Sequence, residues 1–277
     1  MGTLYIVATP IGNLEDATPR AVRTLREADL IFAEDTRRTR TLLDRNGIAA
    51  RPLSLHAHNE AVRLPKALEV LAGGASVALV SDAGTPLVSD PGERLVAAAI
   101  AAGFPVVPVP GASAVLAALS VSGLPAVPFA FLGFLPRKAG PRRALLASYS
   151  ERPETLVIFE SPRRLLNTLR ELAGVLGDRP ASVGRELTKV YEETVRGSLA
   201  ALAEHFDAGV RGEITIVVGG AAPEVSLLPE SDLDAAIRER VAAGESASGI
   251  AKELAAPAGL PRREIYARVV ALRNDAS

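Results

Sequence analysis

Short apolar runs rich in β-branched residues alternate with helical patterns through the first half of the chain. The expected strands cover residues 3–8, 29–33, 76–80 and 105–109, and helices are expected at 18–28, 36–46 and 91–102. Apolar strands separated by helices are typical of a parallel sheet that helices cover on both faces. The alternation therefore predicts an α/β fold.

A proline-rich stretch around residues 124–141 ends this pattern, and a second set of strand-like runs begins within it. Its members are residues 129–134, 155–159, 181–187 and 213–218. A length of 277 residues favours about two domains, so we expect an N-terminal α/β domain at 1–124 and a second one at 125–222. A linker is expected at 219–232. The remaining residues, 231–277, show no strand pattern and predict a small helical unit. Its last two helices fit either a helix-turn-helix-like motif or a plain packing module.

Composition excludes several classes of protein. Cysteine is absent, which removes disulfides, thiolate nucleophiles and cysteine-based zinc sites and fits a reducing, cytoplasmic setting. The net charge is −1, so a nucleic acid must be held by a local basic patch. Residues 95–136 carry no charge, but prolines and glycines divide them into pieces too short for a bilayer, and no membrane segment is expected.

The most informative loop is VSDAGTPLVSDPG, residues 80–92, directly after an expected strand. Its glycines, prolines and aspartates favour a shaped loop at the carboxyl end of the sheet, where open α/β sheets bind ligands. Asp82 offers a carboxylate to ribose hydroxyls or to an ammonium group. The alternative is a turn capped by aspartates.

Two further loops are expected at the same edge of the sheet. Residues 107–114, VPVPGASA, lead into a helix whose free N–H groups, with Ser113, can hold a carboxylate or phosphate. Residues 8–13, ATPIGN, are followed about twenty residues later by Glu34 and Asp35, as in a dinucleotide fingerprint. Because Gly12 is the only glycine of that loop, a Rossmann dehydrogenase is disfavoured.

Charged residues gather at expected strand ends in both halves, in residues 34–40, 159–164 and 185–193. One interpretation is that they form surface salt bridges. The other is that they line a cleft, in which arginines bind phosphate while a carboxylate or a lysine transfers a proton. A segment without acidic residues, 126–150, contains four basic residues: Arg137, Lys138, Arg142 and Arg143. We interpret it either as a flexible loop that reaches a nucleic-acid backbone or as a loop exposed to solvent. The paired histidines at 56 and 58 lack a third ligand nearby, so no metal is expected.

Seven motifs, taken in order, resemble the bacterial small-subunit ribosomal RNA (cytidine-2′-O)-methyltransferases of the tetrapyrrole methylase superfamily. They are VATPIGNLED, EDTRRTR, VSDAGTPLVSDPG, VPGASA, FESPRR, RELTKVYEE and GEITIVV. The resemblance implies two tandem α/β domains of tetrapyrrole-methylase type, the class III methyltransferases, with S-adenosylmethionine bound in the cleft between them and a homodimer as the usual assembly. The implied acceptor is the ribose 2′-hydroxyl of a cytidine in 16S ribosomal RNA, near the decoding centre of the small subunit.

Carried over by motif, the resemblance also implies a set of cofactor-binding residues. They are Pro10, Gly12, Asp82, Ala83, Gly84, Thr85, Ser113, Ala114, Phe159, Glu213 and Ile214. The glycine-rich first loop of the porphyrin enzymes is replaced here by Thr-Pro-Ile-Gly, which favours the RNA-modifying branch.

The main chemical difficulty of such a methyl transfer is the weak nucleophilicity of the acceptor hydroxyl. A sulfonium methyl is already electrophilic, so in-line placement suffices without a metal, but a ribose hydroxyl needs a base or a nearby cation. Glu186 or Lys189 is the candidate for that role. Candidates for holding RNA are Arg37, Arg38, Arg163, Arg137 and Lys138. Two alternatives stay open: methylation of a tetrapyrrole, and a non-catalytic RNA-binding assembly factor that uses the helix-turn-helix.

Overall fold

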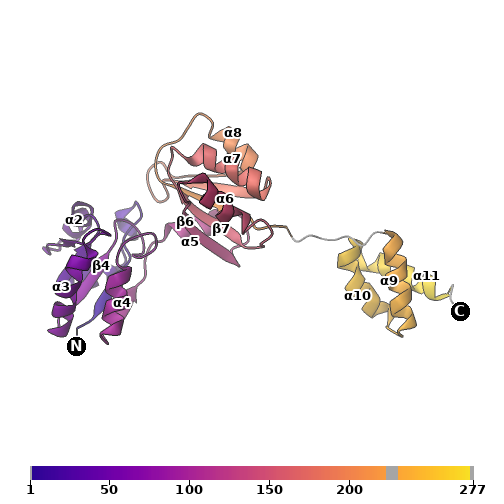
Figure 1. Ribbon diagram of the computed structural model, residues 1–277, viewed down its shortest axis with the longest axis horizontal. Helices are drawn as coiled ribbons and strands as arrows, with labels where there is room; N and C mark the ends of the chain where they lie inside the picture. Colours follow the sequence, from indigo (N-terminus) through magenta and orange to yellow (C-terminus); the bar gives the residue numbers. More distant parts are fainter. Residues whose placement is uncertain (1, 223–229, 275–277) are drawn as a thin grey trace. The chain divides into compact units, whose positions relative to one another are not determined.

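The computed structural model describes residues 2–222 and 230–274. The chain divides into two compact units, Met1–Ala221 and Ala222–Ser277. The first unit holds two five-stranded sheets, and the described part of the second is helical. Figure 1 follows the chain from its indigo N-terminus to the yellow helices at the C-terminus.

The first sheet is entirely parallel, with strand order β3-β2-β4-β1-β5. Its strands are β1 (Leu4–Val7), β2 (Leu30–Ala33), β3 (Leu53–Ser54), β4 (Val77–Val80) and β5 (Val106–Val109). The connecting helices are a 3₁₀ turn (Leu14–Asp16), α1 (Pro19–Glu27), α2 (Thr36–Arg45), α3 (Glu60–Ala72), α4 (Glu93–Ala101) and α5 (Ala114–Val121). A parallel sheet places the carboxyl ends of all five strands, and the loops that leave them, at one edge.

Helices cover both faces of the first sheet. Successive side chains of each strand point to opposite faces, so each strand contributes to two cores. On one face Val7, Ile31 and Val80 pack with residues of α1 and α2. On the other face Leu4 and Leu79 pack with residues of α3 and α4. Burial on both faces explains why these strands read as continuous apolar runs.

The second sheet is mixed, with strand order β6-β7-β10-β8-β9. Its strands are β6 (Phe129–Phe134), β7 (Thr155–Glu160), β8 (Pro180–Arg185), β9 (Glu193–Ser198) and β10 (Ile214–Val218). Only β6 and β7 pair in parallel. One face packs against α6 (Ala139–Ala147), α7 (Leu165–Leu176) and α8 (Leu199–His205), and α7 and α8 lie side by side (Figure 1).

The opposite face of the second sheet packs against the first half of the chain. Val157 of β7 and Val217 of β10 share a buried cluster with Val115 and Leu119 of α5 and with Ile11 from the loop after β1. The two sheets of the first unit are therefore joined by a common apolar core.

The second unit is a bundle of α9 (Glu230–Ala242), α10 (Ala247–Ala258) and α11 (Arg262–Asn274). Its core consists of residues from these three helices and the turn between α10 and α11. Gly259 ends α10 in the left-handed conformation, with φ of 63°, and allows a tight turn before α11. Part of the expected linker, residues 223–229, lies outside the described residues.

The α/β class with a small helical C-terminal unit is confirmed, and two details of the sequence analysis are corrected. Residues 139–147 of the basic segment, which was read as a flexible loop, form α6, and Arg142 and Arg143 pair with Glu171 of α7. The charged residues expected after β8 lead into the edge strand β9, which the sequence analysis missed. Its outward positions are polar, as edge strands commonly are, so its apolar pattern is weak.

Candidate functional site

A cavity of about 500 Å³ lies at the carboxyl edge of the first sheet, between its loops and the second sheet. From the first half it is lined by Ile11, Glu34, Arg38, Asp82, Ala83, Gly84, Thr85, Val88, Ser89, Asp90, Ser113, Ala114 and Val115. From the second half it is lined by Phe134, Phe159, Glu160, Ser161, Pro162, Gly212, Glu213, Ile214 and Thr215. Its volume and mixed lining suit a cofactor-sized ligand.

The loop after β4 is fixed to the loop after β1 by backbone hydrogen bonds. The N–H of Thr9 donates to the carbonyl of Gly84 at 2.8 Å, and the N–H of Gly84 donates back at 3.0 Å. Gly84 has φ of 82°, which a residue with a side chain rarely adopts. Leu87 and Ser89 also have positive φ, 74° and 71°. Backbone strain of this kind concentrates at ligand sites.

Three carboxylates face the cavity from the first half. Asp82 Oδ1 accepts a hydrogen bond of 2.7 Å from the N–H of Asp35, and Arg38 Nε lies 3.6 Å from Asp82 Oδ2. Burial, then the charge of Asp82, raises the pKa of Glu34. Burial, assisted by the charges of Glu34 and Asp82, raises the pKa of Asp90 to about 6 despite a hydrogen bond from Ser81. One arginine among three acids leaves a site that favours a cationic ligand.

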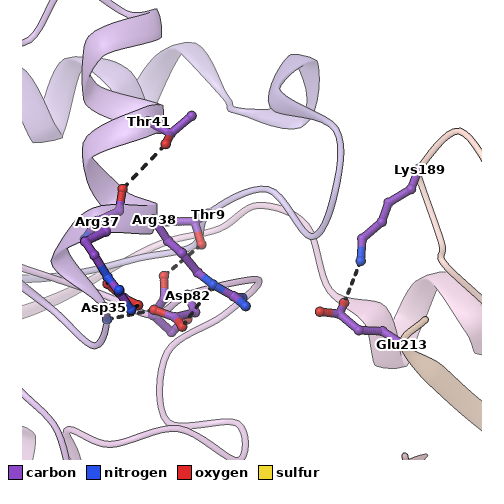
Figure 2. Close-up of polar contacts among 9 residues, drawn as sticks. Thr9, Asp35, Arg37, Arg38, Thr41, Asp82, Lys189 and Glu213 are labelled. Carbon is purple, nitrogen blue, oxygen red and sulfur yellow. Dashed lines mark hydrogen bonds and ion pairs between the residues drawn. The ribbon is translucent and has the colours of Figure 1, made fainter. Parts of the chain in front are cut away.

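Two neighbouring arginines of α2 have different surroundings (Figure 2). Arg38 lies beside Asp82 and lines the cavity. Arg37 instead turns back onto Asp35, with its Nη2 2.7 Å from Asp35 Oδ2, and its side chain is 89% exposed. The hydrogen bonds from Arg37 lower the pKa of Asp35 to about 2.

A lysine and two glutamates form a cluster beside the cavity. Lys189 Nζ lies 2.8 Å from Glu186 Oε1 and 3.1 Å from Glu213 Oε2, and Figure 2 shows Lys189 reaching toward Glu213. Glu186 Oε1 also accepts the N–H of Glu213 at 2.9 Å. The hydrogen bond from Lys189, followed by that from the Glu213 N–H, lowers the pKa of Glu186. Partial burial opposes the charge of Lys189, but its bonds to both glutamates prevail and raise its pKa.

The first loop contacts this cluster at Gly12. A Cβ at Gly12 would lie 2.4 Å from Lys189 Cγ and 2.9 Å from Thr188 Oγ1. Only a glycine allows the lysine stem to pass so close. Glu186 and Thr188 hold positive φ, 49° and 67°, so the lysine loop has a locally strained backbone.

The structure brings most of the expected cofactor residues together and leaves several others apart. Asp82, Ala83, Gly84, Thr85, Ser113, Ala114, Phe159, Glu213 and Ile214 line the cavity, as does Arg38. Of the other candidates, all within the described ranges, none contributes to its lining; these are Pro10, Gly12, Glu186, Lys189, Arg37, Arg163, Arg137 and Lys138.

The lining residues that were not candidate site residues in the sequence analysis include Glu34, Asp90 and Phe134. Glu34 directly follows β2 and Asp90 lies in the loop after β4, both inside quoted motifs, and these positions at the carboxyl edge of the sheet were the available signal. Phe134 ends a strand in an apolar run, FAFLGF, that gives no sign of facing a cavity. Residues 2–222 and 230–274 contain neither a group of three or more potential metal ligands nor a helix long and apolar enough to cross a bilayer.

Comparison with known proteins shows which family the chain resembles. Residues 3–203 match the family described as tetrapyrrole (corrin/porphyrin) methylases. The chain is 49% identical to the "Ribosomal RNA small subunit methyltransferase I" of Mesorhizobium japonicum, over 98% of this chain and 92% of that protein. It is 50% identical to the protein of the same name from Mycobacterium tuberculosis, over 99% of this chain and 96% of that one.

A solved structure shares the fold at lower identity. Uroporphyrin-III C-methyltransferase from Thermus thermophilus, complexed with S-adenosylhomocysteine, aligns with a TM-score of 0.56 and 24% identity. The alignment covers 79% of this chain and 97% of that chain.

Proposed function

Because the chain belongs to the tetrapyrrole (corrin/porphyrin) methylase family and groups within it with proteins named ribosomal RNA small subunit methyltransferase I, we propose that it methylates small-subunit ribosomal RNA with S-adenosylmethionine as the methyl donor. The observation that carries the proposal is the near-full-length identity of 45–50% to those proteins, combined with a cavity of cofactor size at the expected loops.

The residues of the cavity suit S-adenosylmethionine. A sulfonium and an ammonium group are cationic, and Glu34, Asp82 and Asp90 supply compensating negative charge. The N-terminus of α5, capped by Ser113, offers backbone N–H groups to a carboxylate. Phe159 and Ile214 supply apolar surface for an adenine ring. When bound, the cofactor supplies an electrophilic methyl group.

The proposed acceptor is the 2′-hydroxyl of a cytidine ribose in 16S ribosomal RNA, near the decoding centre. The hydroxyl must lose its proton as its oxygen takes the methyl group, and the carboxylate of Glu186 is the proposed acceptor of that proton. The raised pKa of Lys189 keeps its ammonium protonated, so Lys189 serves as the cation that stabilises a developing oxyanion. Glu186 and Glu213 position the ammonium at the rim of the cavity. Arg37, Arg38 and Arg163 are proposed to contact flanking phosphates.

Calorimetric titration with S-adenosylmethionine tests the cofactor. We expect wild type to bind, Asp82→Ala to bind about 10-fold or more weakly because a charged hydrogen-bonding group is lost, and Asp82→Asn to fall between them because it keeps an acceptor for the Asp35 N–H. Asp207→Asn is the matched control, since Asp207 is exposed and pairs with Arg170 away from the cavity.

Transfer of a labelled methyl group to isolated small subunits, followed by mapping of 2′-O-methyl nucleotides, tests the acceptor. Transfer to one cytidine ribose is expected. Transfer to a tetrapyrrole and not to RNA would favour the porphyrin-type activity, and RNA binding without transfer would favour an assembly factor. The same family relationship leads us to propose a homodimer acting in the cytoplasm, which sedimentation of the purified protein and cell fractionation test.

A further inference from the structure

Strand β6 contains an irregularity beside the cavity. Phe131 pairs with Val157 of β7, but the next residue of β7 pairs with Gly133, so Leu132 is an extra residue in β6. Gly133 has φ of 61°. An inserted residue of this kind is a β-bulge, and bulges turn the side chains that follow them to the other face of the sheet.

The bulge decides which face Phe134 occupies. Ala130 and Leu132 pack toward the core under α6, α7 and α8, and strict alternation would send Phe134 to the same side. Instead Leu135 enters that core, and Phe134 lines the cavity. Its ring centroid lies 5.7 Å from that of Phe159.

The Phe134 ring is more accessible than an aromatic residue of a core. Its exposed fraction is 59%, whereas Phe159 beside it packs against the core shared by the two halves. The cavity therefore has one aromatic ring in its wall and a second, open one. An exposed aromatic face in a ligand site is the surface on which an unstacked nucleic-acid base binds.

Two cations follow this ring along the chain. Arg137 and Lys138 are exposed, and among the described residues neither side chain has an ion-pair partner. At three and four residues from Phe134 they lie within about 14 Å of it. Arg142 and Arg143 are different, because both pair with Glu171 of α7. An open ring beside two free cations is a pattern of single-stranded RNA contact.

Resting on the proposed function, we infer that Phe134 is the platform on which the base of the acceptor nucleotide stacks, with Arg137 and Lys138 holding adjacent phosphates. Stacking removes the nucleotide from its neighbours in the RNA and presents its ribose to the cavity. Phe134 is thus a positioning residue for the acceptor, while the cofactor is bound by the other walls.

Substitutions at Phe134 distinguish two possible roles of its ring, which are stacking on a base and filling space in the cavity. Phe134→Ala and Phe134→Leu both remove the ring, and Phe134→Tyr keeps it. We expect Ala and Leu to lower kcat/KM for isolated small subunits roughly 5- to 150-fold and Tyr to keep near wild-type activity. Phe129→Ala is the matched control, because Phe129 lies at the other end of the same strand, is 39% exposed and does not line the cavity.

The affinity for S-adenosylmethionine and the salt dependence of RNA binding complete the test. Phe134→Leu is expected to leave both unchanged, whereas Arg137→Ala and Lys138→Ala each lower the slope of log affinity against log salt by about one. A loss of cofactor affinity equal to the loss of rate would assign the ring to the cofactor and overturn the inference. Wild-type activity in Phe134→Leu would overturn it as well. Absence of methyl transfer by wild type would instead refute the proposed function itself.

Discussion

At the scale of one residue, the burial of Asp90 in the cavity wall lowers the free energy of unfolding when its carboxyl group is ionised. It lies half-buried near Glu34 and Asp82, and its pKa is raised to about 6 from an ordinary value of 3.8. Between these two pH values the folded chain holds a proton that the unfolded chain has lost. Stability therefore falls as pH rises from about 4 through 6, and the penalty stays constant at higher pH.

We predict that Asp90→Asn is more stable than wild type at pH 8 and nearly equal to it at pH 4. Urea unfolding at several pH values measures the difference between the two proteins, which isolates Asp90 from other titrating groups. Asp207→Asn, at an exposed position paired with Arg170, should show no such trend. A difference that does not grow between pH 4 and 7 would mean that Asp90 ionises normally in the folded chain.

The sequence predicts which loops carry ligand-binding residues better than it predicts where each side chain points. Asp82 could be singled out because an acidic residue after a buried strand lies at the ligand edge of a parallel sheet. The sequence could not show which of Arg37 and Arg38 lines the cavity. The outcome depends on Asp35, which caps α2 and binds the side chain of Arg37. The accumulation of Glu34, Asp82 and Asp90 around one cavity likewise requires the loops to be placed in space.

At the scale of elements, Gly133 is the residue on which the bulge of β6 depends. Its φ of 61° disfavours any side chain, and a Cβ there would lie 3.2 Å from Ser89 Oγ. We predict that Gly133→Ala lowers the free energy of unfolding by about 1–2 kcal/mol, as measured by urea denaturation. Gly140→Ala, in α6 with open space around it, is the control and should be neutral or stabilising because alanine favours helix. Equal effects of the two substitutions would contradict a special role for the bulge.

The central strands of both sheets were predicted from sequence, whereas two of the four edge strands, β3 and β9, were not. The strands of the first sheet are covered on both faces, so their apolar runs stand out. Strand β9 lies at the edge of its sheet and has a mostly polar sequence. Helix α6 was missed because its basic residues suggested contact with RNA, while the acidic partner, Glu171, is far away in sequence. Such long-range pairing leaves no local signal.

At the scale of the whole molecule, each compact unit has cores of its own. The cluster of α9–α11 contains residues of the second unit only, and the clusters of the two sheets contain residues of the first only. The cavity is lined by residues of the first unit. We predict that a chain ending at residue 222 folds cooperatively and binds S-adenosylmethionine as tightly as the full chain.

Calorimetry of the shortened and full chains measures both properties. If shortening abolished cofactor binding, the helical unit would be needed for the site. Loss of RNA binding with retained cofactor binding would instead assign the helix-turn-helix to the RNA. Some of its arginines already have acidic partners within the bundle, such as Arg240 with Glu253 and Arg268 with Asp234, so we expect the first unit to keep most of the affinity for RNA.

The apolar core shared by α5 and the second sheet has a consequence for the timing of each reaction cycle. Separating the two halves would expose Val115, Leu119, Val157 and Val217 to water, at a cost of about 25 cal/mol for every Å² uncovered. A hinge that opens wide is therefore too costly to operate at each turnover. Entry and release of ligands are therefore expected to depend on movement of the loops at the cavity mouth, among them the strained loop that carries Leu87 and Ser89.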